Sequence, residues 1–529
     1  MNAPSATRPP RSKTARRGRD VGNLLADFGH DLPARAVQPA VPAERNPFGQ
    51  AVGRRGPAGR GRGRAAATAP MSVWRMTSEQ APVAWPLIAA NGLPPTGAQM
   101  GIDLLSGGAF YCDPIGWVIN DDIPVTNPNV VVFGKPGRGK SATVKAFCVR
   151  MLAFGYRTLI LGDTKDEYEP MCRAFGVQPF IIGHGLSTRV NPLAFGPLGH
   201  GWAGLDAAES QRRSAIMFAR WIVLIRGLVG SQHVAFGPVE ETAVGAALRI
   251  LTGYRTGTTR LTEVTIPQLW HALDEPADEL VAVCRYADRR HFLDATRTLR
   301  DALGSLVKGH LAGLFDDHTS IAVDWRAPIQ SLSLSRLEPL GDEAVGIALT
   351  CLNSWGQAMR EIAEPGDIRI VVRDETWRQM RLGPEAMKSL DANLRLSRRD
   401  ADVQILLAHK PSDMLTAGDS TSQAVAIARD LLHLCDVKVL HGQDRAVADE
   451  LGSLLGLAPM AQQVVTGWAI AGKGRALWLV GDRAYKVQTI LTPVEKQLTF
   501  TNDAIKATPQ KFEKSEGISG PNSGVLLDA

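Results

Sequence analysis

The segment Gly134-Lys-Pro-Gly-Arg-Gly-Lys-Ser141 constrains the fold more than any other part of this 529-residue sequence. It matches the pattern G-x-x-x-x-G-K-[ST], follows the apolar run 130–133 and precedes a helical pattern at 142–152. Its glycines allow the backbone to curl so that consecutive N–H groups face one anion, and the N-terminus of the following helix adds partial positive charge. The strand, loop and helix together predict a phosphate-binding loop in an α/β domain.

This phosphate loop predicts a site for ATP and Mg²⁺. The ammonium of Lys140 is expected to reach the β and γ phosphates, and the hydroxyl of Ser141 to bind Mg²⁺, which neutralises charge during phosphoryl transfer. We expect contacts to the nucleotide from Gly134, Gly137, Arg138, Gly139, Lys140, Ser141 and Ala142.

Short apolar runs that alternate with helical patterns predict an α/β fold with a mostly parallel sheet flanked by helices. The clearest runs are 130–133, 158–161, 180–182, 368–372 and 403–407. Between about 200 and 315 the apolar spacing is helical, which predicts an all-helical insertion. The expected parts are a disordered basic tail (1–70), a first core segment with the phosphate loop (71–200), the helical insertion (201–315), a second core segment (316–500) and a disordered tail (501–529).

The positive charge of the chain is concentrated in the first 70 residues. They carry 13 Lys and Arg against 4 Asp and Glu, which leaves the rest of the chain at −3 although the whole is at +6. Such a tail has two main interpretations: a solvated segment, or one that contacts DNA or anionic lipid through counterion release. Its Arg-rich, acid-poor composition also fits an organellar transit peptide, which ranks lower.

The cysteines and the apolar runs bear on where the protein works. The six cysteines include no close pair, which argues against a zinc site or a disulfide framework and fits a reducing cytoplasm. No run approaches the roughly 20 apolar residues of a membrane helix, so we expect no transmembrane segment. The expected location is the cytoplasm, and a peripheral position at the inner face of the cell membrane is the alternative.

Two adjacent acids, Asp374 and Glu375, follow the apolar run 368–372. At the carboxyl end of a parallel strand, Asp374 would hold Mg²⁺, and Glu375 would orient or deprotonate the attacking water. The alternative is an ordinary surface turn. A further acidic segment, 163–168, ends another run, and its alternative is a solvated turn.

Taken in order, these elements resemble the conjugative-transfer ATPases of bacterial type IV secretion systems, within the FtsK/HerA superfamily of ring-forming motors. The resemblance covers roughly residues 100–495. Its elements are Asn127-Pro-Asn-Val130, the phosphate loop, Asp163-x-Lys165-x-Glu167-Tyr168, Asn191-Pro-Leu193, Asp374-Glu375-Thr-Trp377, the basic stretch 394–399 before 403–409, and the glycine-containing stretches 472–475 and 481–483.

The resemblance implies a RecA-like core in a homo-oligomer, most simply a hexamer, that energises an inner-membrane secretion or conjugation channel. In such rings an arginine of the neighbouring subunit often completes the site. Arg399 is our first candidate for that role, with Arg398 and Arg475 as others. His409 stands where the family usually has a sensor glutamine, and it can hydrogen-bond a phosphate or water.

The resemblance also predicts how such a motor would be recruited. Larger family members dock on the channel through a folded N-terminal domain. Here only about 30 residues separate the basic tail from the core, so docking is expected to depend on another polypeptide.

Two other functions remain open from the sequence. A DNA translocase of the same superfamily would pump duplex through its ring, although the −3 charge outside the tail does not suggest a strongly basic channel. A nucleotide-binding scaffold would bind ATP with little hydrolysis, and only the unusual Arg373 and His409 favour it.

Overall fold

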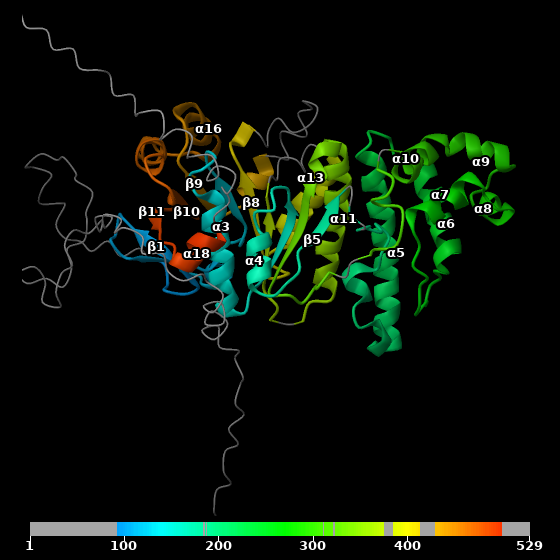
Figure 1. The fold of residues 1–529 in the computed structure, drawn as a ribbon, viewed down its shortest axis with the longest axis horizontal. Coiled ribbons are helices and arrows are strands. Elements are labelled where there is room, and N and C mark those ends of the chain that lie inside the picture. Colours follow the sequence, from blue (N-terminus) through cyan, green and yellow to red (C-terminus); the bar gives the residue numbers. More distant parts are fainter. Residues whose placement is uncertain are drawn as a thin grey trace, which may run out of the picture. The chain divides into compact units, whose positions relative to one another are not determined.

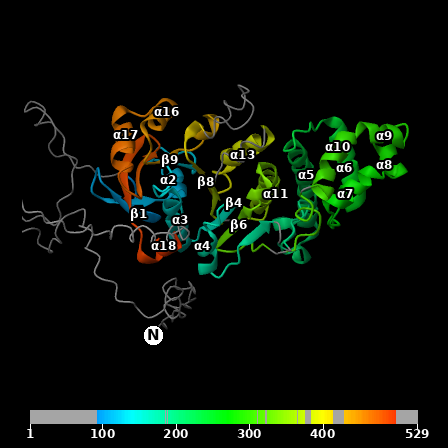
Figure 2. The same ribbon diagram turned by 45° about the horizontal axis from the view of Figure 1, so that its top comes forward.

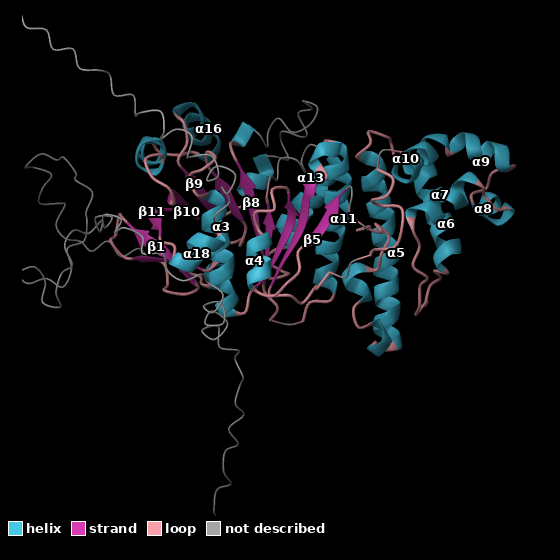
Figure 3. Cartoon of the chain, in the orientation of Figure 1, coloured by secondary structure: helices cyan, strands magenta, loops and turns pink. Residues whose placement is uncertain are grey.

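One mixed sheet runs through the part of the chain that the computed structural model describes, residues 92–499 without 184–185, 187, 310, 321–322, 365, 375–383 and 413–428. In these residues the sheet has 11 strands in the order β2-β1-β11-β10-β9-β3-β8-β7-β4-β6-β5 (Figure 3). The strands are β1 (Ala98–Asp103), β2 (Ala109–Cys112), β3 (Val130–Phe133), β4 (Arg157–Asp163), β5 (Phe180–Gly183), β6 (Ile329–Arg336), β7 (Arg369–Arg373), β8 (Asp402–Ala408), β9 (Val437–His441), β10 (Arg475–Val480) and β11 (Arg483–Thr489).

The sheet is parallel from β9 to β5 and antiparallel from β2 to β9. The five predicted strands are all present, and the predicted RecA-like arrangement of a mostly parallel sheet between helices is confirmed. All four residues of β3 are buried, as expected for a strand covered on both faces. The predictions did not include β6, whose buried Ser331 and Ser333 interrupt the apolar run, or the antiparallel pair of β1 and β2.

Helices cover both faces of the sheet (Figures 1 and 2). Helices α3 and α4 pack on one face, while α11, α13 and α16 pack on the other. Those helices and their neighbours in chain order are α2 (Pro114–Ile119), α3 (Lys140–Met151), η3 (Leu152–Phe154), α4 (Glu169–Ala174), η4 (Gly196–Gly199), η5 (Trp202–Gly204), α5 (Ala207–Gly230), α6 (Pro238–Thr252), α7 (Ile266–Asp274), α8 (Asp278–Val283), α9 (Arg289–Ala295), α10 (Arg297–Lys308), η6 (Glu338–Leu340), α11 (Asp342–Glu361), α13 (Pro384–Leu396), α16 (Arg445–Leu455), α17 (Pro459–Gln463), the π-helix η7 (Val464–Ala469) and α18 (Pro493–Leu498).

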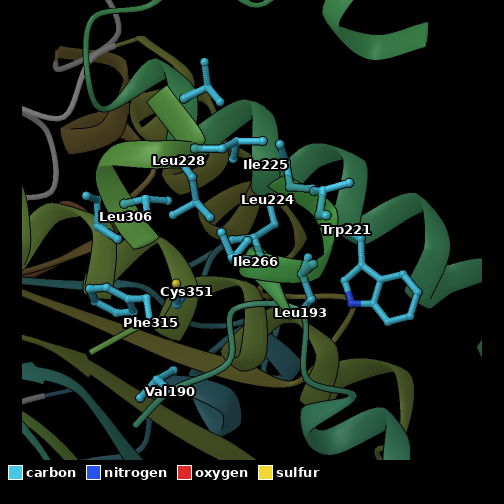
Figure 4. Packing of buried hydrophobic residues seen from close by; sticks show 14 of the residues in the cluster. Val190, Leu193, Trp221, Leu224, Ile225, Leu228, Ile266, Leu306, Phe315 and Cys351 are labelled. Atoms are coloured by element: carbon cyan, nitrogen blue, oxygen red, sulfur yellow. The ribbon is translucent and has the colours of Figure 1, made fainter. Parts of the chain in front are cut away.

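Between β5 and β6 the described residues form helices and no strand. Helix α5 begins where the Asp206 side chain accepts a hydrogen bond from the Glu209 N–H, an N-cap that satisfies one of the free donors of the first turn. Its apolar face, with Trp221 and Ile225, packs against α6 and α11 and is part of a larger buried cluster (Figure 4). The helical segment and the sheet face under α11 therefore share one hydrophobic core.

None of the helices in the described ranges is both long and apolar enough to cross a membrane.

Candidate nucleotide site

The phosphate loop joins β3 to α3 at the carboxyl edge of the parallel strands. Gly137 and Gly139 have φ values of 76° and 101°, a region that a residue with a Cβ rarely adopts. A Cβ on Gly139 would lie 2.9 Å from the Gly474 nitrogen, and a Cβ on Gly134 would lie 2.6 Å from the His441 Cβ. The glycine pattern is therefore required both by the curl of the loop and by the backbone that packs against it.

Lys140 is the first residue of α3, and its side chain folds back over the loop. The ammonium Nζ donates a hydrogen bond to the Gly134 carbonyl at 2.7 Å and lies 2.9 Å from His409 Nδ1. Since an ammonium can only donate, His409 Nδ1 accepts this bond and the ring proton sits on Nε2. The lysine is held in the loop with 8% of its surface exposed.

His409 directly follows β8, the strand between β3 and β7. Its carbonyl accepts a hydrogen bond of 2.6 Å from the Gln443 side chain, which fixes the backbone on the side of β9. The structure thus brings the predicted His409 and Lys140 together. Both come from neighbouring parallel strands that end at the same edge of the sheet.

Asp374 directly follows β7, the next strand along the sheet after β8, so it lies at the same edge as the phosphate loop. Mg²⁺ in nucleotide sites is typically held by one or two protein oxygens together with phosphates and water, and Ser141 with Asp374 has that donor chemistry. Glu375 and Trp377 lie outside the described residues. The two arginines of β7 are buried: Arg373 donates to Asn353 and Gln404, and burial lowers its pKa to about 9.

The acidic segment 163–168 is a tightly held turn and not a solvated one. Asp163 is fully buried and accepts hydrogen bonds from the N–H groups of Lys165, Glu167 and Tyr168. Asp166, which has a positive φ of 54°, is held by the hydroxyls of Ser333 and Ser335 on β6. The turn lies at the carboxyl end of β4, next to β7.

Comparison of the fold with solved structures gives VirB4 of Thermoanaerobacter pseudethanolicus, with a TM-score of 0.59 and 19% identity over 77% of this chain and 99% of that one. The chain has a VirB4-like fold. The bacterial conjugative coupling protein TrwBdeltaN70 (TM-score 0.48, 13% identity, 76% of this chain and 91% of that one) and plasmid coupling protein TrwB in complex with ADP and Mg²⁺ (0.47, 15%, 77% and 92%) are more distant. No protein-family model and no curated protein matches the sequence. The resemblance noted in the sequence is therefore confirmed at the level of the fold.

In this VirB4-like fold the three arginine candidates lie in two places. Arg398 and Arg399 are exposed in the turn before β8, at the opposite edge of the sheet from the phosphate loop, and Arg399 pairs with Asp400 at 2.7 Å. Arg475 begins β10 beside the loop, where it donates to Gln488 and lies 5.3 Å from the Trp468 ring. Within one chain, Arg399 does not meet Lys140.

The VirB4-like fold adds two contacts that sequence reasoning missed. The Gly474 N–H donates to the Arg138 carbonyl at 3.0 Å, so the turn before β10 is docked on the phosphate loop. His441, at the end of β9, is fully buried beside Lys140, and burial and the lysine charge lower its pKa to about 3. The only sequence signal for either was the glycine pattern at 472–474, because nothing local reveals that His441 lies beneath the loop.

Proposed function

We propose that this protein is an ATPase that energises a type IV secretion or conjugative transfer apparatus. One observation carries the proposal: the Lys140 ammonium lies at the shared edge of β3, β8 and β7, beside His409, in a VirB4-like fold. That edge is where open parallel sheets bind ligands. Motor ATPases place their phosphate loop, sensor and acidic strand ends together for the same reason.

The residues divide the chemistry of hydrolysis among them. The N–H groups of the phosphate loop and the N-terminus of α3 bind phosphate oxygens, and Lys140 leaves the Gly134 carbonyl to contact the β and γ phosphates. His409, with its proton on Nε2, can donate to the γ phosphate or the attacking water while Nδ1 keeps Lys140 in place. Mg²⁺, when bound between Ser141 and Asp374, would neutralise phosphate charge. Glu375 is proposed to orient the attacking water.

The remaining parts of the proposal concern assembly. A homo-hexamer is proposed, because the match to VirB4 covers 77% of this chain and 99% of that one, and such motors act as rings. Arg399, at the far edge of the sheet, would serve a neighbouring subunit's site and not its own. The proposed partners are inner-membrane channel components, with residues 1–70 as a contact to DNA or anionic lipid.

Steady-state ATP hydrolysis tests the proposal directly. Turnover by the full chain should be independent of duplex DNA and should fall about 100-fold or more in Lys140→Ala and Glu375→Gln, because each removes one group that acts on the transferring phosphoryl. Lys308→Ala, on α10 with its ammonium 4.0 Å from the Trp270 ring, is the matched control and should keep wild-type turnover. Strong stimulation by DNA would favour a translocase, and tight ATP binding with background turnover a scaffold.

A further inference from the structure

A second lysine on the phosphate-loop helix is buried behind the predicted magnesium site. Lys145 follows Ser141 by four residues, so the two side chains lie one turn apart on the same face of α3. Its side chain is completely buried, whereas lysines are among the residues least often buried without a partner. This position needs an explanation beyond packing.

The surroundings of the Lys145 ammonium are acidic and come from two other strand ends. Glu167 Oε2 lies 3.4 Å from Nζ, and the Tyr168 ring centroid lies 5.0 Å away. Burial lowers the pKa of Lys145, while the negative charges of Glu167, Asp163 and Asp374 oppose that shift. Asp374 follows β7, which pairs in parallel with β4, so it lies at the same edge of the sheet as the turn that carries Glu167.

The cluster of Lys145, Glu167 and Tyr168 is held firmly by the backbone of its acidic turn but has few hydrogen bonds at its centre. Asp163 accepts hydrogen bonds from the backbone of the 163–168 turn, which fixes the positions of Glu167 and Tyr168 beside Lys145. Yet Lys145 Nζ, Glu167 Oε2 and the Tyr168 hydroxyl have no hydrogen-bond partner among the described residues. The 3.4 Å pair is longer than the usual 2.7–2.9 Å of a charge-assisted hydrogen bond. A buried charge with this geometry is weak evidence for stability, because its desolvation is not recovered.

We propose that Lys145 is a positioning residue for phosphoryl transfer: its fixed positive charge orients the Asp374 and Glu167 carboxylates on the side of α3 that carries Ser141. The inference rests on the proposed ATPase function. Both carboxylates are then held on this side of the helix, because both are attracted to one buried ammonium. The lysine acts through these carboxylates and does not contact the nucleotide.

The test is Lys145→Met in the full chain, since methionine matches the length of the lysine stem without its charge. We expect kcat to fall at least 10-fold, nucleotide affinity without Mg²⁺ to stay within about threefold, and the thermal unfolding midpoint to stay equal or rise. A purely structural lysine would instead lower the unfolding midpoint. Lys438→Met is the matched control, because Lys438 on β9 is a half-buried lysine that donates to the Cys435 carbonyl, and it should keep wild-type kcat.

Two further variants, Glu167→Gln and the double variant Lys145→Met with Glu167→Gln, complete the design. If Lys145 merely neutralised Glu167, the double variant would regain wild-type kcat; if it also orients Asp374, the double variant stays at least 10-fold impaired. Wild-type turnover in folded Lys145→Met overturns the inference. If Lys145→Met does not fold, wild-type turnover in Glu167→Gln overturns it, and reduced turnover supports it. Absence of turnover in the wild-type chain would instead reject the ATPase function itself.

Discussion

The two edges of the parallel strands both bury charge, but they pair it differently. At the amino edge, Arg360 Nε lies 2.7 Å from Asp402 Oδ2, with Asp400 at 3.3 Å from the same guanidinium and Arg369 at 3.5 Å from Asp402. At the carboxyl edge, the Lys145 ammonium lies 3.4 Å from the Glu167 carboxylate, and the charges of Asp163 and Asp374 also act on it. The first edge matches two arginines with two aspartates, while the second sets one buried lysine among several carboxylates.

This difference indicates that the amino edge serves the stability of the fold and the carboxyl edge the proposed site. Balanced charge at the amino edge ties α11 to the start of β8 and so supports the fold. The buried lysine at the carboxyl edge costs stability but places opposite charges where phosphate and metal are proposed to bind. Buried polar atoms without a hydrogen-bond partner among the described residues occur at both edges, on Arg369 and Asp402 as well as on Lys145 and Glu167, so the edges differ in how charge is paired and not in whether every atom is satisfied.

The largest effect on stability should come from breaking the amino edge. Asp402→Asn keeps the side-chain volume but leaves Arg360 and Arg369 buried with less opposing charge, so we expect a loss of about 3–5 kcal/mol in the free energy of unfolding. Equilibrium unfolding in urea measures this loss. The contrast between the edges would be lost if this change cost no more stability than Lys145→Met.

At pH 5, a smaller and pH-dependent effect should come from His441. Its pKa is lowered from 6.5 to about 3 by burial, so the folded chain binds no proton there at pH 5 while the unfolded chain does. Stability should therefore be unaffected above about pH 6.5 and fall by up to about 1.4 kcal/mol per pH unit below it, until about pH 3. In His441→Asn this part of the slope should disappear. Equal acid slopes of urea midpoints in the two proteins would contradict the assignment.

The smallest effect should come from an exposed pair beside the loop. Lys135 and Asp444 are 2.8 Å apart, closer than Lys145 and Glu167, but about half of each side chain is exposed. Solvent screening should limit the change in unfolding free energy for Lys135→Ala to about 0.5 kcal/mol. A loss above 1 kcal/mol in chemical denaturation would show that distance matters more than burial in this chain.

The sequence predicted the local parts of this site well. The phosphate loop, its helix and the five apolar strands carry their own signals, because glycine pattern and apolar periodicity act over a few residues. The burial of Arg369 and Arg373 in β7 had no such signal, since their partners Asp402, Asn353 and Gln404 come from α11 and β8. The position of Glu375 and the assignment of Arg399 stay predictions.

By itself, the sequence determined that a phosphate loop follows β3 and that an acidic pair follows β7. Only the tertiary structure decided that β8 lies between these strands and brings His409 to Lys140, and that the turn after β4 brings Glu167 to Lys145. The physical reason is that side-chain patterns encode which segments become strands, whereas the order of strands depends on contacts between residues distant in the chain. The chemistry at the carboxyl edge is set by that order.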